Sequence, residues 1–301
     1  MKPLKGVNTL VMTPFLDGGE VDWASLRRVI DHVIGGGANS LVAIGKIGEF
    51  SVLQMNERRQ VMEEVVDHVA GRVPVGFGII DAGFEQGLTL ARYAKQAGGD
   101  YVMSRPPVDG DMGEYFSQLA DTLPVMIYDQ GLQGDLSMED EVAPICQKND
   151  NIIAVKISGF PDRFEQAKRL LDIPCLAGWD FFSLVAYQLG ADGVISGSAT
   201  LVPTEEVRLY ELAMQHKWDE ARDLFYSNLV PILNYCTFDP HAYSCCKYFL
   251  YYQGLIDVPS VRPPNPDAGA VRRGEIVAIL KRLGLLKAEL VGKLPLCAAT
   301  G

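Results

Sequence analysis

The chain has 301 residues, 48% of them hydrophobic and 22% charged, which suits one large globular domain or two smaller ones. Its net charge of −11 opposes binding to nucleic acid and to anionic membranes. No apolar stretch reaches the roughly 18–20 residues of a membrane span and the N-terminus lacks the apolar core of a signal peptide, so we expect a cytoplasmic protein without nucleic-acid or membrane partners.

Short β-rich runs alternate with helical periods from the N-terminus to about Gln215. The expected strands are 6–12, 40–44, 73–77, 101–103, 124–128, 152–156, 175–177 and 193–196, and the expected helices are 22–34, 56–70, 84–97, 114–123, 138–147, 161–170, 183–189 and 204–215. Eight strands that each precede a helix predict an α/β fold, a closed (β/α)₈ or TIM barrel. The competing open sheet of a dinucleotide-binding fold is disfavoured because no Gly-x-Gly-x-x-Gly follows the first strand.

The strand signal stops after the eighth unit. Helical periods follow at 218–235 and 242–252, then a proline-rich loop at 258–267 and another helix at 268–286. We therefore expect a barrel over residues 1–216 and a C-terminal helical extension over 217–294 that packs on it. Residues 295–301 are mostly small and have no helical or strand period, so they are a candidate for disorder.

Lys156 ends the apolar run of the sixth expected strand. In a parallel barrel the carboxyl ends of the strands carry the catalytic groups, so its side chain should enter the mouth of the barrel. Burial there disfavours the ammonium form, and a neutral buried amine is a nucleophile for carbonyls. The alternative is a strand-end lysine whose stem is buried while its ammonium reaches solvent.

Other polar groups end neighbouring strands on the same face. Tyr128 ends the fifth strand and is a candidate to transfer protons beside the amine. A glycine-rich turn after the second strand can offer backbone N–H groups to a carboxylate. Ser196 and Gly197 end the eighth strand and add a hydroxyl. The residues of the glycine-rich turn are Gly45, Lys46, Ile47 and Gly48.

Several of these segments together resemble the dihydrodipicolinate synthase / N-acetylneuraminate lyase superfamily of class I aldolases and dehydratases. The resemblance runs from about Gly6 to Pro266. The segments that carry it are Thr13-Pro14-Phe15 with Asp17-Gly18 and Val21-Asp22, Gly45-x-x-Gly48-Glu49-Phe50 with Leu53 and Glu57-Arg58, Arg72-Val73-Pro74-Val75, Leu123-Pro124-Val125 through Tyr128, the Lys156 strand, and Gly193-Val194-Ile195-Ser196.

The resemblance implies a TIM barrel and a role for each matched position. Lys156 would form a Schiff base with a 2-keto acid, and Tyr128 would transfer protons at that carbon. The backbone N–H groups around Lys46 and Ile47 would hold the substrate carboxylate, while Glu49 would anchor its loop. The chemistry implied needs no cofactor and no metal, and the quaternary structure implied is a homotetramer built as a dimer of dimers.

Three departures from the family pattern bear on specificity. Lys46 and Ile47 stand where the second-strand loop of the family carries hydroxyl residues that relay protons to the tyrosine. The fourth-strand end, 104–108, lacks the aromatic tyrosine of the family, and Arg105 in it adds a cation near the site. The segment 129–134 lacks the arginine that grips the second carboxylate in the synthase.

We therefore expect a Schiff-base-forming lyase, an aldolase or dehydratase acting on a 2-keto acid derived from a sugar acid, and not a true dihydrodipicolinate synthase. The alternative is a non-catalytic 2-keto-acid-binding protein of the same fold that has lost the proton relay. The candidate catalytic residues are Lys156 and Tyr128, and the candidate substrate-binding residues are Gly45, Lys46, Ile47, Gly48, Arg105, Ser196 and Gly197.

Overall fold

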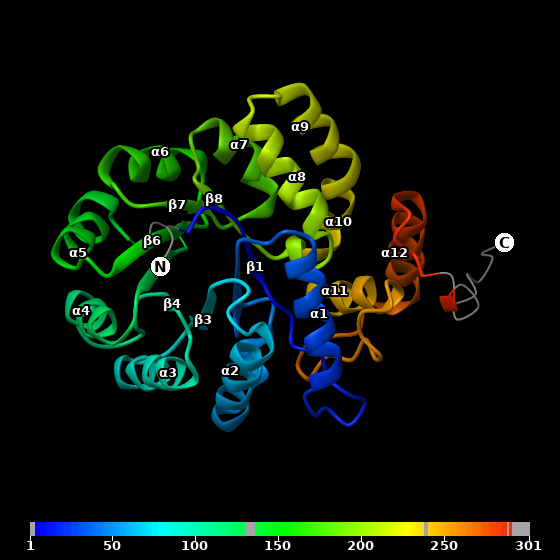
Figure 1. Cartoon of the computed structure of the whole chain (residues 1–301), viewed down its shortest axis with the longest axis horizontal. Helices are drawn as coiled ribbons and strands as arrows, with labels where there is room; N and C mark the ends of the chain where they lie inside the picture. The colour runs from blue at the N-terminus through cyan, green and yellow to red at the C-terminus, as the bar shows by residue number, and fades with distance from the viewer. Residues whose placement is uncertain (1–3, 131–135, 238–239, 288, 291–301) are drawn as a thin grey trace.

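A computed structural model describes residues 4–130, 136–237, 240–287 and 289–290. Its eight parallel strands pair in sequence order, and β8 pairs with β1 to close the barrel, as Gly6 opposite Gly193 shows (Figure 1). The predicted TIM barrel is thus confirmed. The strands are β1 Gly6–Leu10, β2 Ser40–Ala43, β3 Val75–Ile79, β4 Tyr101–Ser104, β5 Val125–Asp129, β6 Ile152–Ile157, β7 Cys175–Ala177 and β8 Gly193–Ser196.

A helix follows every strand and the helices form the outer ring of the barrel (Figure 1). The strands are buried on both faces, which explains their near-continuous apolar sequences. The ring helices are α1 Trp23–Gly35, α2 Met55–Val69, α3 Phe84–Ala97, α4 Met112–Thr122, α5 Ala143–Lys148, α6 Pro161–Leu170, α7 Ser183–Gln188 and α8 Pro203–Met214.

Proline explains two places where the predicted helices were wrong in detail. The helix expected at 138–147 starts as a π-helical turn, Met138–Val142, and continues as α5. The helix expected at 218–235 is divided into three parts: α9 Trp218–Leu224, a π-helical turn Phe225–Leu229 and α10 Val230–Cys236. Pro144 and Pro231 lie in the first turns of α5 and α10. Each lacks the N–H of an internal helical hydrogen bond, so the bonding pattern changes ahead of it.

The third strand also begins later than predicted, at Val75 instead of residue 73. The carboxylate of Asp100 accepts a hydrogen bond from the N–H of Val75 at 2.8 Å, which fixes the beginning of the strand. Pro74, the residue before it, has no N–H to contribute to the sheet.

The C-terminal helices lie against the barrel on the side of α1 and α8 (Figure 1). They include α11 Ala242–Tyr252 and α12 Gly269–Leu283. Arg28 of α1 donates a hydrogen bond to the carbonyl of Leu255 at 3.1 Å and pairs with Asp257 at 2.8 Å, so the extension is tied to the first ring helix. The predicted tail at 295–301 lies outside the described residues.

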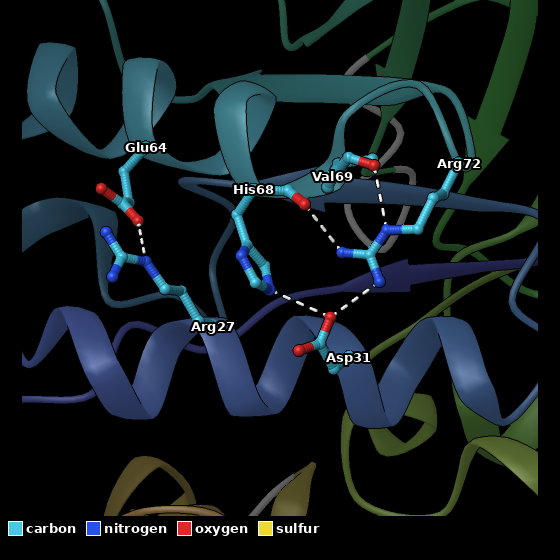
Figure 2. Close-up of polar contacts among 6 residues, drawn as sticks. All are labelled: Arg27, Asp31, Glu64, His68, Val69 and Arg72. Atoms are coloured by element: carbon cyan, nitrogen blue, oxygen red, sulfur yellow. Dashed lines mark hydrogen bonds and ion pairs between the residues drawn. The ribbon is translucent and has the colours of Figure 1, made fainter.

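Polar contacts on the outer surface join α1 to α2 (Figure 2). Asp31 accepts hydrogen bonds from His68 at 2.9 Å and from Arg72 at 2.7 Å, and Arg27 pairs with Glu64. The Asp31 side chain is 51% exposed. Exposed pairs of this kind contribute only about 0.2–1 kcal/mol each, so packing of the apolar helix faces remains the main source of stability. None of the helices in the described ranges combines the length and apolar character that a bilayer-spanning segment requires.

Candidate active site

A cavity of about 360 Å³ opens at the carboxyl ends of the strands. Five of the predicted site residues line it: Lys46, Ile47, Tyr128, Lys156 and Gly197. Residues after β7 and β8, together with Thr237 and Pro240 between α10 and α11, complete its wall. Other lining residues are Gln130, Gly178, Trp179, Asp180, Cys236, Thr237 and Tyr243.

Lys156 and Tyr128 lie side by side on neighbouring strands, opposite each other in the register of β5 and β6. Lys156 is only 3% exposed. Its Nζ atom lies 3.9 Å from the centroid of the Tyr128 ring, which places the amine against the aromatic face. The lysine therefore stays inside the cavity instead of extending to solvent.

The environment of Tyr128 favours its ionised form. Burial works to raise the pKa of the phenol, but the charge of Lys156 and the hydroxyl of Ser158 act against it. Lys46 and Arg105 add smaller contributions of the same sign, and the net effect holds the pKa of Tyr128 below its ordinary value. A phenol with a lowered pKa is better suited to accept and return a proton near neutral pH.

Gly178 leaves the space that the lysine side chain occupies. A Cβ atom at this position would lie 2.7 Å from Cε of Lys156 and 2.1 Å from Oγ of Ser158. Both separations are shorter than any normal van der Waals contact, so a side chain here would displace the lysine. Glycine after β7 is thus a requirement of the site geometry.

The turn after β2 presents two backbone donors. Gly48 donates to the carbonyl of Gly45 at 3.0 Å, which closes the turn. Neither the N–H of Lys46 nor that of Ile47 has an acceptor among the residues that the structure describes. Glu49, at the end of the turn, has a φ of +54°, a conformation that non-glycine residues adopt rarely and that concentrates at functional sites. The turn can therefore bind a carboxylate.

Glu49 anchors this turn to the C-terminal extension, the role the sequence predicted for it. Its side chain is fully buried, pairs with Lys247 of α11 at 2.6 Å and accepts a hydrogen bond from Asn265 at 2.7 Å. Lys247 also donates to the carbonyl of Ser260 at 2.6 Å. Burial lowers the pKa of Lys247 to about 8, although the charge of Glu49 opposes that shift. The pair ties the candidate carboxylate site to a residue about 200 positions away.

Four predicted residues do not line this cavity. Arg105 lines an adjacent one of about 350 Å³, which shares Tyr128 and Gln130 with the first, and its guanidinium pairs with Asp81 at 2.6 Å. Gly45 and Gly48 lie in the turn after β2 but are not among the residues that line the cavity. Ser196 is fully buried, and its hydroxyl lies 3.2 Å from that of Ser198.

Sequence reasoning assigned no role in the site to Asp180 or Glu206. Asp180 lies three residues after the end of β7 and lines the cavity, and its position near a strand end was the available signal. Glu206 reads as a surface acid in the first turn of α8, yet it is 1% exposed. Asp129, the residue after Tyr128, is buried and pairs with Arg163 at 2.7 Å. Among the described residues no cluster of three His, Cys, Asp or Glu side chains is arranged to hold a metal ion.

Comparison with known sequences gives a consistent result over nearly the whole chain. The profile of the Dihydrodipicolinate synthetase family matches residues 3–283. A 4-hydroxy-tetrahydrodipicolinate synthase of Methanococcus vannielii is 33% identical over 298 residues, covering 94% of this chain and 100% of that protein. The enzyme of the same name from Pelobacter propionicus is 30% identical over 295 residues, covering 94% and 99%.

Solved structures show the same barrel. The dihydrodipicolinate synthase of Aquifex aeolicus superposes with a TM-score of 0.86 at 25% identity and covers 94% of this chain and 100% of that one. A prophage protein of the dihydrodipicolinic acid synthase family from E. coli K12, solved in complex with pyruvate, gives a TM-score of 0.85 at 25% identity, with coverage of 94% and 99%.

Proposed function

This chain belongs to the Dihydrodipicolinate synthetase family and is a Schiff-base lyase of the class I aldolase type; on that premise we propose that its substrate is a 2-keto acid derived from a sugar acid and that it is not a dihydrodipicolinate synthase. The observation that carries the proposal is the burial of Lys156 against Tyr128 in a cavity where Asp180 supplies a carboxyl group. The pyruvate bound in the prophage protein of this family supports a 2-keto acid as the ligand class.

The geometry supports a sequence of steps at the keto carbon. Nζ of Lys156 attacks the ketone while the N–H groups of Lys46 and Ile47 hold the adjacent carboxylate. Loss of water gives an iminium, which withdraws electrons from the neighbouring carbon. Cleavage of the C3–C4 bond, or loss of a C3 proton, then leaves an enamine. Tyr128 accepts and returns the proton, because its ring lies against the amine and its pKa is lowered.

The residues that line the cavity argue against the binding of a second carboxylate group of the substrate. Among its described lining residues, the cations are Lys46 and Lys156, and Lys156 is the nucleophile. Lys46 is exposed and offers a point charge, whereas bidentate recognition of a carboxylate is suited to arginine. Arg105 pairs with Asp81 in the adjacent cavity. Asp180 instead offers a carboxyl group, which suits the hydroxyl groups of a sugar acid.

A substrate panel tests this function. The purified protein is incubated with 2-keto-3-deoxy sugar acids of five and six carbons, and products are followed by mass spectrometry. Release of pyruvate with an aldehyde would identify an aldolase, and loss of one water would identify a dehydratase. Absence of both reactions, with rapid turnover in the synthase reaction, would contradict the proposed substrate class.

We predict that condensation of pyruvate with aspartate semialdehyde is slow. The segment after Tyr128 lacks an arginine, and loss of a charge-assisted pair to a substrate carboxylate typically costs about 1.5–3 kcal/mol, or one to two orders of magnitude in rate. The replacement of the loop hydroxyls by Lys46 and Ile47 adds to the deficit. A coupled assay with dihydrodipicolinate reductase measures the rate against a genuine synthase.

Arg105 provides the control for that assay. If turnover approaches that of the synthase and Arg105→Ala removes it, then Arg105 has replaced the missing arginine, and the proposed exclusion of the synthase reaction is wrong. Slow turnover that is unchanged in Arg105→Ala would support the proposal.

We also predict a homotetramer built as a dimer of dimers. Phe249 and Tyr252 of the aromatic-rich α11 are buried within the chain, so we do not assign the interface to them. An apolar surface remains between α6 and α7, where Phe160, Val185 and Leu189 are 52%, 39% and 37% exposed. Sedimentation velocity at micromolar concentration should show a tetramer. Phe160→Glu should shift it to smaller species, and a monomeric wild-type protein would contradict the prediction.

A further inference from the structure

The carboxyl group of Asp180, in the cavity wall, and the buried carboxyl group of Glu206 are linked through Ser198. Oδ2 of Asp180 accepts the N–H groups of Gly197 at 3.1 Å and Ser198 at 3.2 Å. Oγ of Ser198 donates to Oε1 of Glu206 and lies 3.2 Å from Oγ of Ser196. The Ser196 hydroxyl also acts to lower the pKa of both carboxyl groups, so it lies near each of them. A connected path thus runs from the cavity wall to a carboxyl group that is 1% exposed.

Burial and the repulsion between the two carboxyl groups favour a proton bound to one of them. Burial raises the pKa of Asp180, and burial together with the charge of Asp180 raises the pKa of Glu206 to about 8. Two interacting carboxyl groups of this kind titrate as a pair and share one proton near neutral pH.

Other titratable groups face the pair from every neighbouring element. The charge of Lys156 on β6 favours the ionised form of Asp180, whereas Glu205 on α8 favours the protonated form of Glu206. The Tyr187 phenol on α7 and the Cys236 thiol on α10 also lie close, and burial raises the pKa of each well above its ordinary value. Both therefore remain neutral and do not compete with the carboxyl pair for its proton.

We propose that Asp180 is a catalytic acid of the Schiff-base step and that Glu206 stores its proton, delivered through Ser198 and Ser196. This inference rests on the proposed function, because it assigns a role within the reaction of Lys156 with a 2-keto acid. It also supplies a relay in a chain whose second-strand loop carries Lys46 and Ile47 in place of hydroxyl residues.

The proton balance of the step is complete within the protein. Nζ of Lys156 forms a bond to the ketone carbon, and one proton passes from nitrogen to the new alkoxide, giving a carbinolamine. Asp180 then donates the shared proton to the hydroxyl as the C–O bond breaks, and water leaves. The nitrogen lone pair forms the C=N bond of the iminium. Both carboxyl groups are then ionised, and the iminium charge stabilises them. Hydrolysis of the product iminium reverses the step and returns the proton to the pair.

The rate of iminium formation tests the relay. Protein is mixed with pyruvate, quenched with borohydride at increasing times, and analysed by intact mass. Glu206→Gln should slow adduct formation by about 10²-fold, the lower range of general acid catalysis, while the final amount at saturating pyruvate stays at the wild-type level. Glu211→Gln on the same helix is the matched control, since Glu211 is exposed, and it should react like wild type.

The pH profile distinguishes a relay from a structural role. In the wild type the rate should fall as the pH rises through the titration of the pair near 8, because the acid form is lost. In Glu206→Gln the remaining carboxyl group titrates alone, so this fall should move to lower pH. Asp180→Asn should be slow at every pH and should lack the fall.

The double variant Ser196→Ala/Ser198→Ala covers the case of a Glu206→Gln variant that fails to fold, because it removes both hydroxyl groups of the path and keeps both carboxyl groups. It should also slow adduct formation. Wild-type rates and pH profiles in folded Glu206→Gln or in the folded double serine variant would overturn the relay and leave the Schiff-base function standing. Failure of the wild type to form any adduct would instead refute the proposed function itself.

Discussion

Lys156→Ala is expected to lower turnover of the substrate by about four orders of magnitude or more, the scale of loss seen when a catalytic nucleophile is removed. Lys156 is the amine that the barrel holds inside the cavity against Tyr128, and no other buried lysine among the described residues lines that cavity. The fold should remain, because the substitution removes an amine from a cavity wall and leaves the apolar part of β6 unchanged.

Lys46→Ala is the matched control for this substitution. Lys46 lines the same cavity but is exposed, so its loss should weaken substrate binding and leave covalent chemistry intact. Circular dichroism and thermal unfolding establish that both variants are folded. Turnover by Lys156→Ala near the wild-type rate, or its loss in Lys46→Ala instead, would transfer the role of nucleophile to Lys46.

Gly178→Ala is expected to have the second-largest effect. The added Cβ would meet Cε of Lys156 at 2.7 Å and Oγ of Ser158 at 2.1 Å, so the lysine must move. A displacement of about 1 Å in a reacting group can cost about 10²-fold in rate. Overpacking of a close-packed region typically costs about 1–3 kcal/mol of stability as well. Steady-state kinetics and chemical denaturation measure the two effects separately.

Gly113→Ala provides the comparison, because the nearest atom to its added Cβ lies at 3.4 Å and the residue is helical. It should have nearly wild-type kinetics and stability. If Gly178→Ala also retains the wild-type rate, the position of Lys156 does not depend on this contact. A loss of stability with unchanged kinetics would make Gly178 a packing residue only.

The barrel could be predicted because its signal is local. Each strand is a short apolar run between turn residues, and each helix has its own period and ends, as at Gly98 after α3. The order of the elements then allows few topologies. The position of Lys156 at a strand end follows directly, since the carboxyl ends of parallel strands meet on one face.

The rest of the site depends on contacts between segments that are distant in the sequence, and a local sequence pattern does not indicate such contacts. Glu206 has the sequence context of an acid in the first turn of a helix, and only the packing of α8 against the turn after β8, where Ser198 lies, makes it buried. Lys247 lies in an aromatic-rich helix, and its partner Glu49 is about 200 residues away. The adjacent cavity that holds Arg105 likewise exists only once two strand-end loops have folded together.

Site-specific trapping with pyruvate tests the central claim most directly. The protein is incubated with pyruvate, reduced with borohydride, digested and mapped by tandem mass spectrometry. A Schiff-base lyase whose nucleophile is Lys156 should gain one reduced pyruvyl group per chain, on the peptide that contains Lys156, and Lys156→Ala should gain none. No adduct in the wild type, or an adduct on Lys46, would contradict the assignment.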